Sequence, residues 1–325
     1  MNRAVMGIAL CVGLLAIAFA GAAPEAEVQG LYEGSCKDAK GETKLEARVV
    51  AQGKGVYKVF VREVVGEKTT AKAELDGKTE GDAVSFAGKV GNVEWSCTYA
   101  DGTLKGTCGQ GCTLELKRAE RQSPTLGAKP PEGAIVLLPP DPKSSDEMVR
   151  RKGKDGTEPE WKVLEDGGVP IPKGGMNSKR AFDGSFKLHV EFKIPFLPDK
   201  HGQGRGNSGV YLPNGDEIQV LDSFGDTTYL GGGCGGLYKY KDPDAFDKFS
   251  LASLPPLAWQ TYDVEYRVEK KDGKLVGKPK VTVLHNGIKI HDKFQVQMNA
   301  KKGGFHFQDH GNPVQYRNIW VLPLE

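Results

Sequence analysis

The sequence has no excess of charge of one sign and no basic run with interleaved aromatic residues. Its 44 lysines and arginines nearly balance its 42 aspartates and glutamates, which leaves a formal net charge of +2. Binding to a nucleic acid requires a basic patch or stripe that neutralises phosphates. The sequence therefore gives no reason to expect a nucleic acid as a partner.

The sequence also lacks an apolar run of the ~20 residues that a membrane-spanning helix needs. Ala4 to Phe19 is apolar but short, follows the positive charge of Arg3, and precedes small-x-small cleavage patterns. Ala134 to Leu138 is far too short to span. These features predict a signal peptide over residues 1–22, with no lipid-anchoring cysteine after it. We expect a periplasmic or extracellular protein without an integral membrane segment once the signal is removed.

Beyond this segment the sequence has no helix signal, and its 43 glycines, β-branched runs and turn pairs are typical of an all-β protein. The pattern predicts a small antiparallel sandwich or barrel over residues 29–118 with an accessory role. A dense series of prolines predicts an extended, semi-rigid connector over residues 119–154. A second β domain is expected over residues 155–325.

Cysteine is scarce, and an exported protein favours disulfides over metal ligation. Four of the cysteines lie in the first β domain, and they permit three pairings. We predict Cys97–Cys108, across a turn at Asp101-Gly102, and Cys36–Cys112, between the first and last strands. Zinc ligation by the four is the alternative. Nothing in the sequence assigns a role to Cys234.

Strict alternation in the second domain predicts half-buried strands in two packed antiparallel sheets. Apolar residues from Phe186 to Ile194 alternate with polar ones, which places His189 on the solvated face. The pair Asn286-Gly287 between two apolar runs is the strongest short hairpin signal, because both central residues of a type I′ turn need positive φ.

Three segments contain more polar residues than the alternation of apolar and polar residues along a half-buried strand requires. The glycine-rich segment 202–211 contains Arg205 and Asn207, which can donate hydrogen bonds to sugar hydroxyls. In the segment 216–225, Glu217 and Gln219 share one face of a strand and Asp222 lies near its end. This arrangement suits acid–base chemistry on a sugar. It also loosely resembles the acidic strand of laminarinase-type glucanases, although Gln219 and Asp222 stand where these enzymes have their second and third acids.

The third segment, 307–320, contains a histidine, an arginine and several amides just before a final apolar strand. They are His310, Arg317, Gln308 and Asn312. A histidine beside an aspartate in a Gly-Pro loop is a candidate general base.

Together these segments resemble the 3-keto-disaccharide hydrolase domain family. The resemblance covers most of the region from Trp161 to Leu324 and rests on phrases that occur in one order: Asn207 to Tyr211, Glu217 to Gly225, Cys234 to Tyr238, Trp259 to Tyr262, His285 to Gly287, Gln308 to Val314 and Tyr316 to Trp320. It implies a concanavalin-like jelly-roll sandwich and a substrate oxidised at C3 of a glucoside.

A C3 ketone acidifies the proton on C2, so a base can remove this proton and the glycosidic oxygen can leave from C1. On this reading the base is Glu217 or His310, and Arg317 or Arg205 stabilises the enolate. Asp222 is an acid or an orienting group. Hydroxyl-binding residues are Asn207, Gln219, Tyr238, Gln308 and Asn312. A divalent cation held by His310 and carboxylates is an alternative electrophile, although no ligand spacing establishes it.

Two other functions fit the same fold. A non-catalytic carbohydrate-binding module would present an aromatic platform, for which Tyr211, Phe224 and Tyr238 are candidates. A conventional glucanase would use two carboxylates and would cleave sugars that are not oxidised. The oligomeric state is left open.

Overall fold

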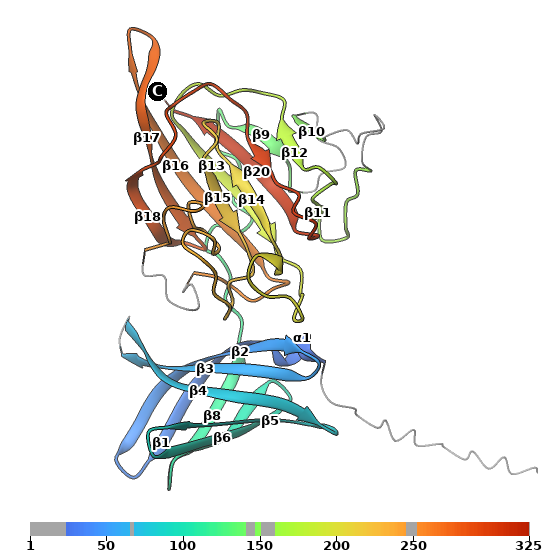
Figure 1. The fold of residues 1–325 in the computed structure, drawn as a ribbon, viewed down its shortest axis with the longest axis vertical. Coiled ribbons are helices and arrows are strands. Elements are labelled where there is room, and N and C mark those ends of the chain that lie inside the picture. The colour runs from blue at the N-terminus through green and yellow to red at the C-terminus, as the bar shows by residue number, and fades with distance from the viewer. Residues whose placement is uncertain (1–23, 66–67, 141–146, 151–159, 245–251, 325) are drawn as a thin grey trace, which may run out of the picture.

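The computed structural model describes residues 24–65, 68–140, 147–150, 160–244 and 252–324, so the expected signal peptide over residues 1–22 lies outside the described residues. The described chain is almost entirely β-structure, which confirms the all-β prediction. A closed barrel lies at one end of the molecule and a two-sheet sandwich at the other (Figure 1). No helix in the described ranges is long and apolar enough to cross a membrane.

The barrel contains eight antiparallel strands in sequence order, and the last strand pairs with the first. A one-turn helix, α1 (Glu25–Val28), precedes strands β1 (Gly30–Asp38), β2 (Gly41–Gly53), β3 (Val56–Val65), β4 (Lys68–Glu80), β5 (Ala83–Val90), β6 (Val93–Ala100), β7 (Thr103–Cys108) and β8 (Thr113–Ala119). Alternate residues such as Tyr57, Val59 and Val61 point inward and pack a continuous core. Closure of the sheet removes the free edges along which strands otherwise aggregate.

The barrel cysteines differ from the expected pairing. The two-residue turn at Asp101-Gly102 places Cys97 opposite Gly106, while Cys108 lies opposite Trp95. Cys97 is therefore two residues out of register with Cys108, and it is buried and unbonded. The predicted Cys97–Cys108 disulfide is wrong.

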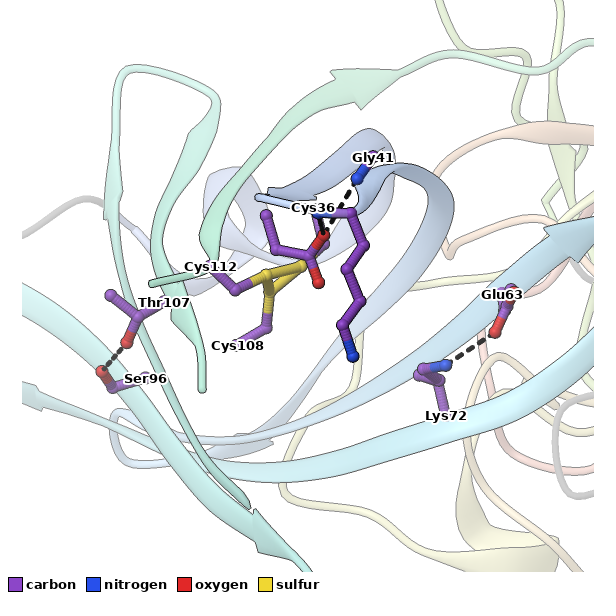
Figure 2. Close-up of a disulfide and its surroundings, with 10 residues drawn as sticks. Cys36, Gly41, Glu63, Lys72, Ser96, Thr107, Cys108 and Cys112 are labelled. Carbon is purple, nitrogen blue, oxygen red and sulfur yellow. Dashed lines mark hydrogen bonds and ion pairs between the residues drawn. A yellow bond between two sulfur atoms is a disulfide. The ribbon is translucent and has the colours of Figure 1, made fainter. Parts of the chain in front are cut away.

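The sulfur atoms of Cys36, Cys108 and Cys112 instead converge at the ends of β1, β7 and β8 (Figure 2). Each of the three pairs is within disulfide-bonding reach, and Cys36–Cys112, the second predicted pair, is one of them. Because one sulfur atom forms only one disulfide bond, a single pair is bonded at a time and the third cysteine is left as a thiol.

The sandwich consists of two antiparallel sheets. The five-stranded sheet contains, in spatial order, β10 (Met148–Arg150), β12 (Met176–Ser178), β19 (His306–Phe307), β14 (Ser208–Tyr211) and β15 (Glu217–Val220). The larger sheet contains β11 (Val169–Pro170), β20 (Gln315–Pro323), β13 (Phe186–Lys193), β16 (Trp259–Lys271), β17 (Lys274–His285) and β18 (Ile288–Gln295), with β9 (Ile135–Leu138) paired to β20. A single-turn 3-10 helix, η1 (Gly202–Gly204), precedes β14.

The two sheets pack their apolar faces together around one core. Phe186 stacks on Tyr266 with ring centroids 4.6 Å apart, and Phe305 meets Phe186 edge-on at 5.1 Å. Asn286 and Gly287 both have positive φ and join β17 to β18, which confirms the predicted hairpin.

The proline-rich segment, predicted as an extended, semi-rigid connector over residues 119–154, packs on the sandwich and adds β9 and β10 to its sheets. Residues 123–128 lie on the outer face of the larger sheet, where the Thr125 hydroxyl donates to Asp263 (2.6 Å) and the Gly127 amide donates to Glu191 (2.6 Å). This cover explains why His189 is fully buried rather than solvated: its Nδ1 lies 2.7 Å from Asp263 and its ring stacks on Trp320.

Candidate active site

The outer face of β14 and β15 carries the densest group of functional side chains from the predicted set. Val210, Ile218 and Val220 point into the sandwich core, so the alternating residues Tyr211, Glu217 and Gln219 project from the opposite face. Tyr211 lies directly across from Glu217 in the strand register, and Gly209 lies across from Gln219. The two-residue period of the strand is what brings Glu217 and Gln219 to the same face.

Glu217 is only 5% exposed and lies over the backbone of β14. A Cβ atom at Gly209 would overlap Oε1 of Glu217, so glycine is required for this close approach. Burial raises the pKa of Glu217 to about 7, against the opposing effects of a hydrogen bond from Tyr211 and the positive charge of Lys239. The carboxyl group therefore changes its protonation state near neutral pH.

Three amide side chains form a connected network beside Glu217. The Gln203 Oε1 atom accepts hydrogen bonds from Asn207 Nδ2 and Gln219 Nε2, both at 2.9 Å. Gln203 is anchored in turn by its Nε2 atom, which donates to the carbonyl oxygen of Gly232 (2.9 Å). The Oδ1 atom of Asn207 and the Oε1 atom of Gln219 are buried and accept no hydrogen bond from the described residues. Each is a buried acceptor whose hydrogen-bond partner the described residues do not supply, whereas buried polar atoms are normally paired.

Aromatic residues and one lysine form the rim of this face. The hydroxyl groups of Tyr229 and Tyr238 lie 2.7 Å apart, and their rings pack edge-on. Tyr229 is 46% exposed, as is expected of a ring available for stacking on a ligand. Lys239 has a positive φ and places its ammonium group 5.2 Å from the centre of the Tyr238 ring.

His306 and Gln308 extend the face across β19. The His306 ring packs 5.2 Å from the Tyr211 ring, and its Nδ1 atom lies 2.8 Å from Asn177 Oδ1. Gln308 Nε2 donates to the Tyr211 hydroxyl (3.2 Å). The predicted set omits His306 and Gln203, yet the alternation of Phe305 and Phe307 around His306 already indicated its side of the sheet.

Two predicted site residues form a buried ion pair instead of facing a ligand. Arg205 is fully buried and Asp222 is 2% exposed, with Nε and Oδ2 2.6 Å apart. The second oxygen of Asp222 accepts the backbone amide of Phe224 (3.0 Å). Both carboxylate oxygens of Asp222 are therefore engaged within the protein, which disfavours its predicted role as a catalytic acid.

Arg317 lies on the other sheet, on its outer face, and does not meet Glu217. Its Nε atom donates to Glu191 (2.8 Å), its Nη1 atom donates to the carbonyl oxygen of Asp166 (2.6 Å), and the guanidinium lies 4.0 Å from the centre of the Trp259 ring. The predicted grouping of Arg317 with Glu217 is wrong, because β20 belongs to the opposite layer of the sandwich.

His310 is exposed in the loop after β19, and its imidazole makes no hydrogen bond to the described residues. Asn312, in the same loop, ties this loop to the site by accepting the backbone amide of Gly206 (3.1 Å). Within the described ranges, only Cys36, Cys108 and Cys112 of the barrel bring three metal-ligating atoms within 4.8 Å of one another.

The comparison with protein families gives a match over the sandwich. The 3-keto-alpha-glucoside-1,2-lyase-like domain matches residues 142–322, more than half of the 325 residues. The chain belongs to this family. The family resemblance expected from the sequence is thereby confirmed, and the matched range of the 3-keto-alpha-glucoside-1,2-lyase-like domain contains every residue of the face around Glu217.

Two solved structures from Parabacteroides distasonis, each named as a proposed glycosyl hydrolase, are similar to this chain. The first is 30% identical, covers 60% of this chain and 85% of its own, and has a TM-score of 0.49. The second is 20% identical, covers 60% of this chain and 95% of its own, and has a TM-score of 0.40. The comparison with curated proteins gives no match.

Proposed function

We propose that this chain is an exported enzyme that cleaves the glycosidic bond of 3-keto-glucosides or 3-keto-disaccharides, with Glu217 as the general base. The observation that carries the proposal is a buried carboxyl group with a pKa of about 7, next to amide oxygens that have no partner among the described residues. A base whose pKa lies near the working pH combines basicity with a large ionised fraction. The family name and the names of the similar structures support a glycosidic substrate.

The C3 ketone determines the proposed chemistry. The carboxylate of Glu217 removes the proton from C2, and the electron pair moves to the C3 oxygen as an enolate. As the ketone forms again, the C1–O bond breaks and a double bond forms between C1 and C2. The proton held by Glu217 passes to the departing oxygen, which regenerates the carboxylate. Water then adds across the double bond, with its oxygen on C1 and a proton on C2, so the net reaction is hydrolysis.

Each neighbour of Glu217 has a role in this scheme. Tyr211 hydrogen-bonds the carboxyl group and orients it. The positive charge of Lys239 lowers the pKa of Glu217. We assign this ammonium group the role of stabilising the negative charge that develops on the C3 oxygen. The amide oxygens of Asn207 and Gln219 accept hydrogen bonds from sugar hydroxyls.

The contacts of Asp222 disfavour a conventional two-carboxylate glucanase. That mechanism requires a second acid facing the same sugar. Asp222 was the candidate, and its carboxylate is bound to Arg205 and to a backbone amide. Binding without turnover is the second candidate function, and the exposed Tyr229 ring beside Tyr238 favours it.

A single comparison tests these candidates. Purified protein is incubated with a 3-keto-glucoside and with the parent glucoside, and the enone and the free 3-keto sugar are measured. We expect turnover of the oxidised substrate alone and a loss of kcat of about 100-fold or more in Glu217→Gln. The exposed Glu165→Gln is the matched control and should keep full activity. Full activity of Glu217→Gln would overturn the assignment, and retention of sugar without product would favour the binding module.

A further inference from the structure

The loop that holds Gln203 lies between the face around Glu217 and the barrel. Its central anchor is the guanidinium of Arg205, which is fully buried. Besides Asp222, this group donates to the carbonyl oxygens of Pro198 (3.2 Å) and Lys200 (3.3 Å), so it closes the loop on itself. Since Arg205 follows η1 directly, this closure also positions Gln203.

Arg205 also donates hydrogen bonds to residues of the barrel domain. Its Nη1 and Nη2 atoms both lie 3.3 Å from the carbonyl oxygen of Ala51 in β2, and Nη2 lies 3.4 Å from Gln29 Oε1. The same Gln29 oxygen accepts the backbone amide of Ala51 (2.9 Å), and Gln29 is 2% exposed. A guanidinium has five N–H donors, and the barrel supplies acceptors that the sandwich alone does not.

Apolar packing lies next to this polar contact. Phe224, two residues after Asp222, forms a separate buried cluster with Val50 and Phe60 of the barrel. The guanidinium of Arg48 lies 5.2 Å from the centre of the Phe224 ring. The backbone at Gly225 approaches Val50 so closely that a Cβ atom there would overlap its side chain. Because Arg205, Asp222 and Gln29 are all buried, their hydrogen bonds are strengthened by the low local dielectric and hold one geometry.

This contact leads directly to the ligand-facing amides. Gln203 lies two residues before Arg205 and holds both Asn207 and Gln219 through its Oε1 atom. Asp222 lies two residues after β15, the strand that carries Glu217 and Gln219, and its backbone amide donates to the Arg205 carbonyl oxygen (2.9 Å). The Arg205–Asp222 pair therefore joins both segments that flank the site to the same point of the barrel.

We propose that the barrel is a structural part of the substrate site, and that Arg205 and Asp222 are positioning residues through which Gln29 and Ala51 fix the amide network of Gln203. The barrel thereby sets the orientation of the groups that bind sugar hydroxyls. Binding of the sugar thus depends on a domain other than the one that carries Glu217. This inference rests on the proposed function for its kinetic consequence, but its structural consequence is independent of any substrate.

The variant Gln29→Met tests this proposal in the full-length protein, because it keeps the side-chain length and removes the Oε1 atom that accepts from Arg205 and from the Ala51 amide. We expect faster hydrogen exchange at residues 199–212 and an increase in KM of about tenfold for a 3-keto-glucoside. The pH dependence of kcat should stay as in the wild type, because the surroundings of Glu217 are unchanged. The matched control is Ser96→Ala, which removes an exposed hydrogen bond to Thr107 on the barrel surface and should alter neither reading.

Unchanged hydrogen exchange at residues 199–212, or faster exchange there with an unchanged KM, would overturn the proposal. If Gln29→Met does not fold, Phe60→Leu weakens the same interface from its apolar side and is expected to give the same two changes. If the wild-type protein does not turn over any 3-keto-glucoside, the proposed function fails, and the hydrogen-exchange reading by itself decides the inference about the barrel.

Discussion

Oε1 of Glu217 lies against the backbone of Gly209, in the space that a Cβ atom at residue 209 would occupy. The two residues belong to adjacent strands, and the missing side chain leaves the space that the carboxyl group occupies. This contact contributes to the burial that raises the pKa of Glu217 to about 7. It also makes a glycine, which has no chemistry of its own, a determinant of the proposed base.

Substitution of this glycine should therefore affect catalysis. In Gly209→Ala we expect kcat to fall at least tenfold, because Glu217 must move to avoid the new methyl group. Overpacking of this kind also lowers the free energy of unfolding by about 1–3 kcal/mol. Gly204→Ala is the control, since a Cβ atom there meets nothing within 4 Å. Equal activity of the two variants would contradict this account.

The pH dependence of the reaction follows from the raised pKa. Glu217 must be ionised to accept a proton, so kcat/KM should rise with pH through about 7 and level off above it. A rate profile without a transition between pH 6 and 8, measured on a 3-keto-glucoside, would argue against Glu217 as the base.

The raised pKa of Glu217 also makes the free energy of unfolding depend on pH. The dependence is opposite to that of a carboxylate with a lowered pKa, because ionisation of Glu217 destabilises the folded state. Below a pH of about 4.5 Glu217 is protonated in both the folded and the unfolded states. Between about 4.5 and 7 only the unfolded state loses the proton, so stability falls by about 3 kcal/mol over this window and then stays level. Glu217→Gln should therefore be more stable than the wild type at pH 8, while it is inactive. Denaturant unfolding at pH 5 and pH 8 measures this difference.

Arg317 is expected to matter for stability rather than for turnover. Although burial opposes ionisation of Glu191, hydrogen bonds from His189, Asn318, Arg317 and the Gly127 amide hold its pKa at about 2. The resulting stabilisation is present above a pH of about 4.5 and is lost as the pH falls toward 2.

Arg317→Ala should lower the free energy of unfolding at pH 7 by about 2 kcal/mol, because it removes a charged hydrogen bond to Glu191. Its kcat per folded molecule should equal that of the wild type. The control is Arg267→Ala, whose partner Glu265 lies on the exposed part of the sheet and whose loss should cost far less. A tenfold loss of kcat in Arg317→Ala would contradict this prediction and would indicate a role of Arg317 in catalysis.

The three converging cysteines of the barrel predict a particular thiol count. One disulfide among Cys36, Cys108 and Cys112 leaves one of them reduced, together with Cys97 and Cys234. A protein produced without residues 1–22, which contain Cys11, should therefore show three reactive thiols when it is unfolded. Cys97→Ser should lower this number by one and leave the disulfide intact.

Treatment with a chelator before thiol titration separates the disulfide from the metal alternative. If the three cysteines hold a metal ion, which their spacing within 4.8 Å permits, chelation raises the count to five without a reductant. A count of one that rises to two in Cys97→Ser would show that Cys97 is also oxidised, and it would contradict the register of β6 and β7.

Local rules account for much of the fold. Alternation placed Phe186 and Leu188 in the core, and the Asn286-Gly287 pair located a hairpin, because strand period and turn geometry depend on neighbouring residues alone. The same period put Glu217 and Gln219 on one face. Closure of the barrel did not follow from these rules, because it requires β1 to meet β8 across about eighty residues of chain.

The sequence by itself therefore determined the β-strands, their buried faces and the segment that carries Glu217. Only the tertiary structure decided which polar residues meet. His189 was expected on the solvent side, but residues 123–128 cover it. Arg317 was expected in the site, but it lies on the opposite sheet. Arg205 and Asp222 share the site segments and yet turn toward the barrel. The physical reason is that alternation states only which side of its own strand a residue occupies, whereas the packing of distant segments decides what lies on that side.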